Sequence, residues 1–69
     1  MKYVIFANAY DINEIIKDKN HIDDILDFDL LKITCEEDYI KAFSLIEMRG
    51  SYAFLSEKDY CEIEKIIIK

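Results

Sequence analysis

The side chains that could do chemistry in this sequence are one histidine, two cysteines and several groups of carboxylates. A nucleophilic dyad would have to pair His21 with Cys35 or Cys61, because a thiol needs a neighbouring base to become a strong nucleophile. Nothing in the spacing of these three residues favours that arrangement. They also fall short of a zinc site, which takes four ligands and often includes a Cys-x-x-Cys pair. We therefore expect no enzyme, no bound metal and no cofactor, and interpret both cysteines as reduced core residues.

The acidic residues are concentrated in one part of the chain. The 69 residues carry a net charge of −6. Residues 21–40 contain seven acidic side chains and one basic side chain, Lys32, so this stretch alone has a net charge of −6 and the rest of the chain is neutral. A solvated helix face is one explanation. The other is a surface for a basic partner, since rows of carboxylates attract grooves that normally bind phosphates. The acidity itself excludes ordinary nucleic-acid binding, which needs a basic surface. The seven residues of this candidate surface are Asp23, Asp24, Asp27, Asp29, Glu36, Glu37 and Asp38.

The same carboxylates allow a magnesium site as an alternative. In a parallel sheet the carboxyl ends of the strands meet at one rim, where ligands bind. That rim would bring together Asp11, residues 36–38 and residues 57–59, and Mg²⁺ prefers such oxygen ligands. Asp27-Phe28-Asp29, by contrast, lacks the glycine and the later glutamate of a calcium-binding loop.

Apolar runs alternate with helical patterns along the chain. We predict strands over residues 3–7, 29–34 and 51–55, the first of them buried on both faces. The predicted helices are those begun by the capping patterns at Asp11, Thr34 and Ser56, together with a short helix over residues 22–28, after a break near Asn20, that buries Ile22, Ile25 and Leu26. Gly50 ends the third of these four helices. A hairpin with a fourth strand over residues 61–68 is the alternative to the last helix.

This order, β-α-α-β-α-β-α, predicts one compact α/β domain over residues 1–69. Alternating strands and helices favour a three-stranded, mostly parallel sheet with right-handed crossovers and three or four helices around it. In the helix over residues 36–49, Tyr39, Ala42, Phe43 and Ile46 share an arc that faces the core. Leu45 and Met48 fall outside that arc and are candidate contacts for a partner.

These features predict a non-enzymatic protein-binding inhibitor whose acidic surface blocks a basic, nucleic-acid-handling partner. The short, acidic, isoleucine- and lysine-rich and alanine-poor composition is typical of the accessory inhibitors that phages and mobile elements direct against host defence, such as anti-CRISPR and anti-restriction proteins. One alternative is an immunity- or antitoxin-like subunit, or a homodimer, held through Leu45 and Met48. Another is the small magnesium-dependent domain. The apolar run over residues 3–7 is too short for a secretion signal and no stretch is long enough to span a membrane, so we expect a cytoplasmic protein that binds neither membrane nor nucleic acid.

Overall fold

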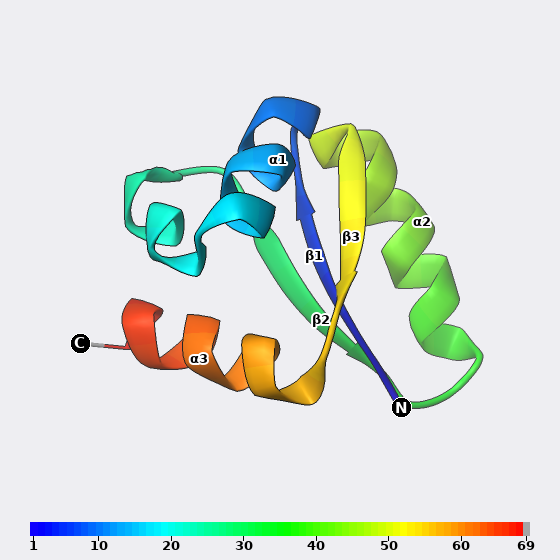
Figure 1. Cartoon of the computed structure of the whole chain (residues 1–69). Helices are drawn as coiled ribbons and strands as arrows, with labels where there is room; N and C mark the ends of the chain where they lie inside the picture. The colour runs from blue at the N-terminus through cyan, green and yellow to red at the C-terminus, as the bar shows by residue number, and fades with distance from the viewer. Residues whose placement is uncertain (69) are drawn as a thin grey trace.

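Residues 1–68, which the computed structural model describes, form three strands, three α-helices and one 3-10 helix (Figure 1). The element order agrees with the prediction, and the C-terminal segment is a helix rather than the alternative hairpin. In chain order the elements are β1 (Lys2–Ala7), α1 (Ala9–Lys17), η1 (Lys19–Asp24), β2 (Asp29–Ile33), α2 (Glu37–Arg49), β3 (Ser51–Leu55) and α3 (Glu57–Ile67).

The sheet is antiparallel, so the prediction of a mostly parallel sheet is wrong. The strand order is β2-β1-β3, and both outer strands run opposite to β1. Lys2 lies opposite Ile33 in one pair, and Tyr3 lies opposite Leu55 in the other. The outer strands β2 and β3 share a direction, but β1 lies between them, so they form no parallel pair.

A reversal of the chain after α1 explains the antiparallel pairing. The α1 helix ends at Lys17, and Asp18 adopts an extended conformation while its side chain accepts a hydrogen bond from the Asn20 N–H at 3.0 Å. The chain then returns through η1 and residues 25–28 to the end of the sheet where β1 finished (Figure 1). A single helix after β1 would carry the chain to the opposite end of the sheet and give a parallel second strand. Because η1 follows α1, the chain returns instead, and β2 is antiparallel to β1. The predicted break near Asn20 is real, but its effect on strand direction was not anticipated.

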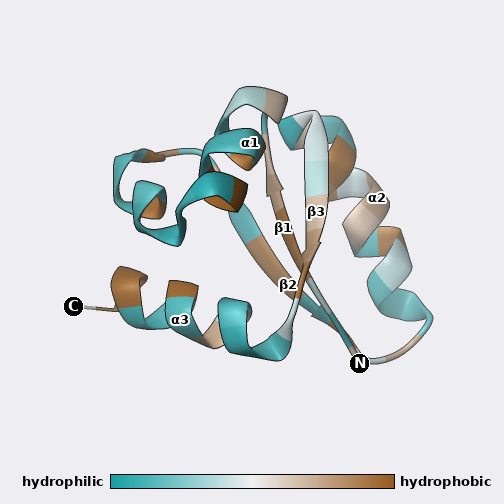
Figure 2. Ribbon diagram, viewed as in Figure 1, coloured by the Kyte–Doolittle hydropathy of each residue, from teal (hydrophilic) through white to brown (hydrophobic). Residues whose placement is uncertain are grey.

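Helices cover both faces of the sheet. On one face, Ala42 and Leu45 of α2 pack against Val4 and Phe6 of β1 and against β2. On the other face, α1, η1 and α3 bury a cluster of isoleucines against Ile5 and Ala7. Brown, hydrophobic segments of these helices accordingly turn toward the strands (Figure 2). Residues 4–7 are all buried, which confirms the predicted two-sided burial of the first strand.

Helix ends agree only partly with the predicted caps. Ser56 caps α3 as predicted, and Gly50 ends α2 with the left-handed φ of 98° that favours glycine. Asp11, however, lies inside the first turn of α1, because Asn8 is the N-cap and accepts from the Asp11 N–H at 2.8 Å. Thr34 does not cap α2 either; its N–H donates to the Asp38 carboxylate at 2.8 Å.

Candidate protein-binding surfaces

The histidine and the two cysteines lie on three different segments of the chain. Cys35 follows β2, Cys61 lies in α3, and both thiols are free and exposed, so their predicted place in the core is wrong. The Nε2 atom of His21 lies 3.6 Å from the Glu14 carboxylate. Among residues 1–68, no group of three or more histidine, cysteine, aspartate or glutamate side chains is arranged to hold a metal ion.

The strand-end rim on which the magnesium hypothesis depends is incomplete, because it lacks Asp11. Because β1 is antiparallel to both neighbours, its carboxyl end lies at the opposite side of the sheet from theirs. Asp11 is therefore separated from residues 36–38 and 57–59 by the length of the strands, about 17 Å for five residues. The magnesium-dependent domain loses its structural basis.

The seven candidate carboxylates also divide between the two ends of β2. Residues 23–29 lead into the strand, whereas residues 36–38 follow it. Between them the exposed Lys32 interrupts the acidic character of the strand itself. The seven residues therefore form two separate groups rather than one continuous acidic edge.

Two of these carboxylates accept hydrogen bonds from other parts of the chain. Asp38 accepts hydrogen bonds from the N–H of Thr34, its hydroxyl at 3.1 Å and the Cys35 N–H at 3.3 Å. The Thr34 N–H is the main cause that lowers the pKa of Asp38 below its ordinary value, followed by the Thr34 hydroxyl. Asp29 accepts from Arg49 Nε at 2.8 Å in a half-buried pair that joins the start of β2 to the end of α2.

The segment over residues 24–27, which we call the Leu26 segment, is the most prominent acidic and apolar feature. Leu26 is 92% exposed and stands between Asp24 and Asp27, which are also exposed. The prediction that Leu26 is buried in a short helix is wrong, because η1 ends at Asp24. Ile25 is extended and points into the core, and neighbouring residues of an extended chain point to opposite sides. Burying Ile25 therefore turns Leu26 outward.

Two contacts restrain the position of this segment. Ile25 is buried in the isoleucine cluster, and Arg49 reaches Asp27 at 3.8 Å as well as Asp29. Earlier in the chain, Lys19 of η1 binds Glu62 and Asp59 of α3 at 3.1 and 3.2 Å, and these contacts, that with Glu62 first, raise the pKa of Lys19. These ion pairs join η1, which precedes the Leu26 segment, to α3.

The apolar residues of α2 are arranged differently from the prediction. Leu45 is buried against the sheet, so it is not a surface residue, whereas Met48 is exposed as expected. Phe43, assigned to the core-facing arc, is 66% exposed, and Tyr39 is also only partly covered. The helix lies over β1 and contacts both neighbouring strands, and its buried residues Ala42 and Leu45 pack in the cluster formed with β1 and β2.

Sequence reasoning missed the aromatic residues of β3. Tyr52 and Phe54 are 45% and 60% exposed, and their rings meet edge to face with centroids 5.6 Å apart. Together with Phe43 they border an apolar hollow of about 190 Å³ between α2 and β3. The signal was the alternation of Tyr52, Ala53 and Phe54, which puts both aromatic rings on one face of the strand.

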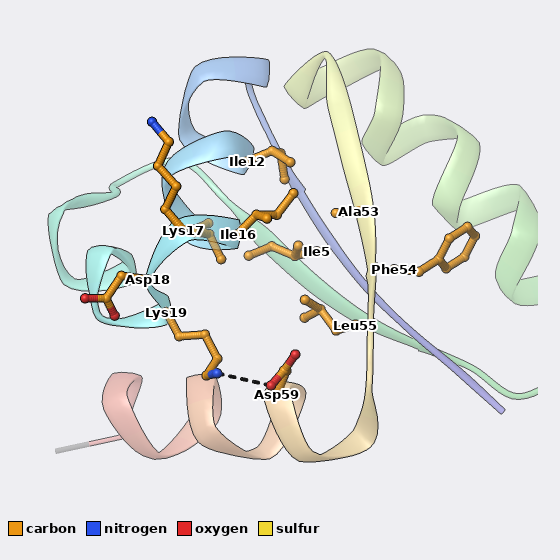
Figure 3. Close-up of a pocket in the computed structure, with 11 residues that line it drawn as sticks. Ile5, Ile12, Ile16, Lys17, Asp18, Lys19, Ala53, Phe54, Leu55 and Asp59 are labelled. Atoms are coloured by element: carbon orange, nitrogen blue, oxygen red, sulfur yellow. Dashed lines mark ion pairs between the residues drawn. The ribbon is translucent and has the colours of Figure 1, made fainter.

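A second groove of about 460 Å³ lies on the other face of β3, between α1 and α3 (Figure 3). Ile12 and Ile16 of α1 and Leu55 of β3 line it, and the Lys19–Asp59 ion pair lies at the α3 end. Ile16 is largely exposed there. This groove is therefore part apolar and part charged, since Lys17, Asp18, Lys19 and Asp59 also line it, whereas the hollow beside α2 is apolar.

Comparisons with models of protein families, with curated proteins and with solved structures found no match to this chain. Within residues 1–68, no helix is long and apolar enough to cross a membrane. The function must therefore be inferred from the surfaces described above.

Proposed function

We propose that this chain is a non-enzymatic protein-binding inhibitor that engages a basic, nucleic-acid-handling partner through the Leu26 segment. The observation that carries the proposal is the 92% exposure of Leu26 between two exposed carboxylates. An apolar side chain surrounded by charges matches the apolar core and polar rim of a protein interface. A reducing, cytoplasmic location suits the two exposed thiols, which form no disulfide.

The electrostatics of the segment suit a basic partner. Residues 23–29 contribute four carboxylates, of which Asp27 and Asp29 pair with Arg49. Residues 21–29 contain no lysine or arginine, so this short part of the chain is strongly acidic in sequence. Such a field accelerates encounter with a basic groove and weakens with added salt. Blocking a groove of this kind is the action expected of the anti-defence inhibitors whose composition the chain shares.

Leu26 supplies the part of the binding energy that charge alone does not. Burying a leucine completely is worth about 1.5–3 kcal/mol, and Leu26 has almost all of its surface left to bury. Because Ile25 and Arg49 already fix the segment, little ordering entropy is lost when a partner binds.

The test is affinity capture with the tagged chain, comparing the wild type with Leu26→Ser and the control Ile40→Ser. Ile40 is an exposed apolar residue of α2, far along the chain from the Leu26 segment, so the control makes the same chemical change elsewhere. We expect wild type and I40S to retain the same basic proteins and L26S to bind them at least about ten-fold more weakly. Equal retention by L26S and wild type contradicts the proposal.

A second candidate function is pairing through the apolar surface of α2, as an immunity- or antitoxin-like subunit. The exposure of Met48 favours it, but Leu45, the other residue on which it was based, is buried. Met48→Asp should then abolish assembly while L26S leaves it intact.

A further inference from the structure

We propose that a second copy of this chain pairs with β3, antiparallel and about a two-fold axis, to continue the sheet across the dimer. This interaction goes beyond the proposed function and uses the opposite edge of the sheet from the strand that the Leu26 segment precedes. In Figure 1 β3 lies in front of β1 and β2, and no described element crosses in front of it. One row of its backbone N–H and C=O groups therefore has no strand beside it.

The two edges of the sheet differ in how they are protected against pairing. Native edge strands usually carry charges, proline or bulges that discourage association. The β2 edge has Asp29 and Lys32, whereas β3 reads Ser-Tyr-Ala-Phe-Leu and has none of these features. The unprotected edge is also the one beside the apolar hollow that Phe43, Tyr52 and Phe54 border. Exposed, uncharged and apolar edges of this kind pair with other strands.

The β3 sequence is suited to a second copy because it is nearly symmetric about Ala53. In an antiparallel pair centred there, Ala53 faces its own counterpart, and Tyr52 lies opposite Phe54 of the second copy. The same pair forms again on the other side of the axis, as an isologous interface requires. Aromatic pairs opposite one another across strands are among the stabilising pairs of antiparallel sheets.

The position of α2 leaves room for this pairing. The two-fold axis keeps both α2 helices on the same face, and each lies over the central strand β1, with contacts to β2 and to β3 on either side. In the dimer the two β1 strands are three strand spacings apart, about 14 Å. Helices in direct contact are only about 8–10 Å apart, so the helices do not collide. The space between them is filled by Phe43, Tyr52 and Phe54 from each copy.

The area available is that of a small, reversible interface. At roughly 200 Å² for a whole aromatic side chain, the exposed parts of Phe43, Tyr52 and Phe54 amount to about 350 Å² per copy. Specific interfaces begin at about 600 Å² per partner. The backbone edge of β3 and the exposed Ile16 on the other face supply the remainder. A dimer with a micromolar dissociation constant is expected.

Cysteine cross-linking tests both the dimer and its register. In a background with Cys35→Ser and Cys61→Ser, which removes two exposed thiols, Ala53→Cys places two thiols across the axis. Their Cα atoms are then about 4.5–5.5 Å apart, within disulfide range. Ser51→Cys is the matched control on the same face of the same strand. Its counterpart lies four residues away along the partner strand, about 14 Å, too far to bridge.

We expect A53C to form a covalent dimer under mild oxidation and S51C to remain monomeric. Sedimentation equilibrium at about 100 µM should give twice the 8.2 kDa chain mass for the wild type and a monomer for Phe54→Lys, whose substituted side chain is exposed in the free chain. A monomeric wild type at that concentration, or equal cross-linking of A53C and S51C, overturns the proposal. Because the cross-link needs no destabilising substitution, a misfolded F54K leaves the test intact. Neither result depends on Leu26, so failure here is distinct from failure of the proposed function.

Discussion

Replacing Ile63 by alanine tests whether α3 is docked as described. Ile63 is 0% exposed and packs in the isoleucine cluster with Ile5 and Ile15. The substitution removes three carbons, worth about 0.8 kcal/mol each, and adds the cost of a cavity. We therefore expect the free energy of unfolding to fall by about 3–4 kcal/mol. A chain of 69 residues has a total stability of about 3–10 kcal/mol, so this loss is a large part of the whole.

Ile67→Ala is the matched control in the same helix. Ile67 is 43% exposed, and alanine is the better helix former, so its loss should stay below about 1 kcal/mol. Urea denaturation followed by circular dichroism measures both variants against the wild type. The reasoning is refuted if Ile63→Ala costs no more than Ile67→Ala, because α3 would then not be packed on the sheet through Ile63.

Three further predictions concern local contacts. Because the pKa of Asp38 is lowered in the folded state, its contribution to stability is present above the ordinary pKa of 3.8 and lost as pH falls through the folded value. Asp38→Asn should therefore reduce the fall of Tm at acidic pH. The pKa of Lys19 is raised, so its contribution to stability is present below pH 10.5 and lost as pH rises through the folded value. Lys19→Met should therefore lessen the loss of Tm above pH 10.5, where the raised pKa of the buried Tyr60 adds a separate loss. Gly50→Ala should lower the unfolding free energy by about 1 kcal/mol in urea, since an added Cβ meets no atom within 4 Å and only the left-handed backbone opposes it. A neutral G50A would mean that α2 does not end in that conformation.

The order of the elements could be predicted from the sequence, but the direction of the strands could not. Isoleucine spacing, Gly50 and the serine cap at Ser56 are local signals, and each marks its element correctly. Strand direction depends instead on where the chain goes after Asp18, whose extended conformation and bond to the Asn20 N–H reverse it. The hydrophobic periodicity of the sequence does not indicate the direction that the chain takes after Asp18.

The candidate surfaces were predicted in part, for a similar reason. The concentration of acidic residues in residues 21–40 can be counted in the sequence. Their division between the two ends of β2, and the hydrogen bonds that Asp29 and Asp38 accept, depend on the tertiary structure and cannot. The prediction that Phe43 is buried and Leu45 exposed assumes that the most apolar stripe of the helix faces the sheet. In the structure, α2 packs Leu45 against β1 and β2 instead, and Phe43 stays exposed beside the aromatic residues of β3.

Two variants that remove the same charge from opposite ends of β2 test whether the Leu26 segment binds the basic partner. Asp24→Asn/Asp27→Asn changes the Leu26 segment, and Glu36→Gln/Glu37→Gln changes two exposed carboxylates after the strand. The dissociation constant for a captured basic partner is measured by calorimetry at low and high salt. We expect the first variant to bind at least about ten-fold more weakly and with a smaller salt dependence, and the second to stay close to the wild type. Equal losses in both variants, or none in the first, would contradict the proposed function.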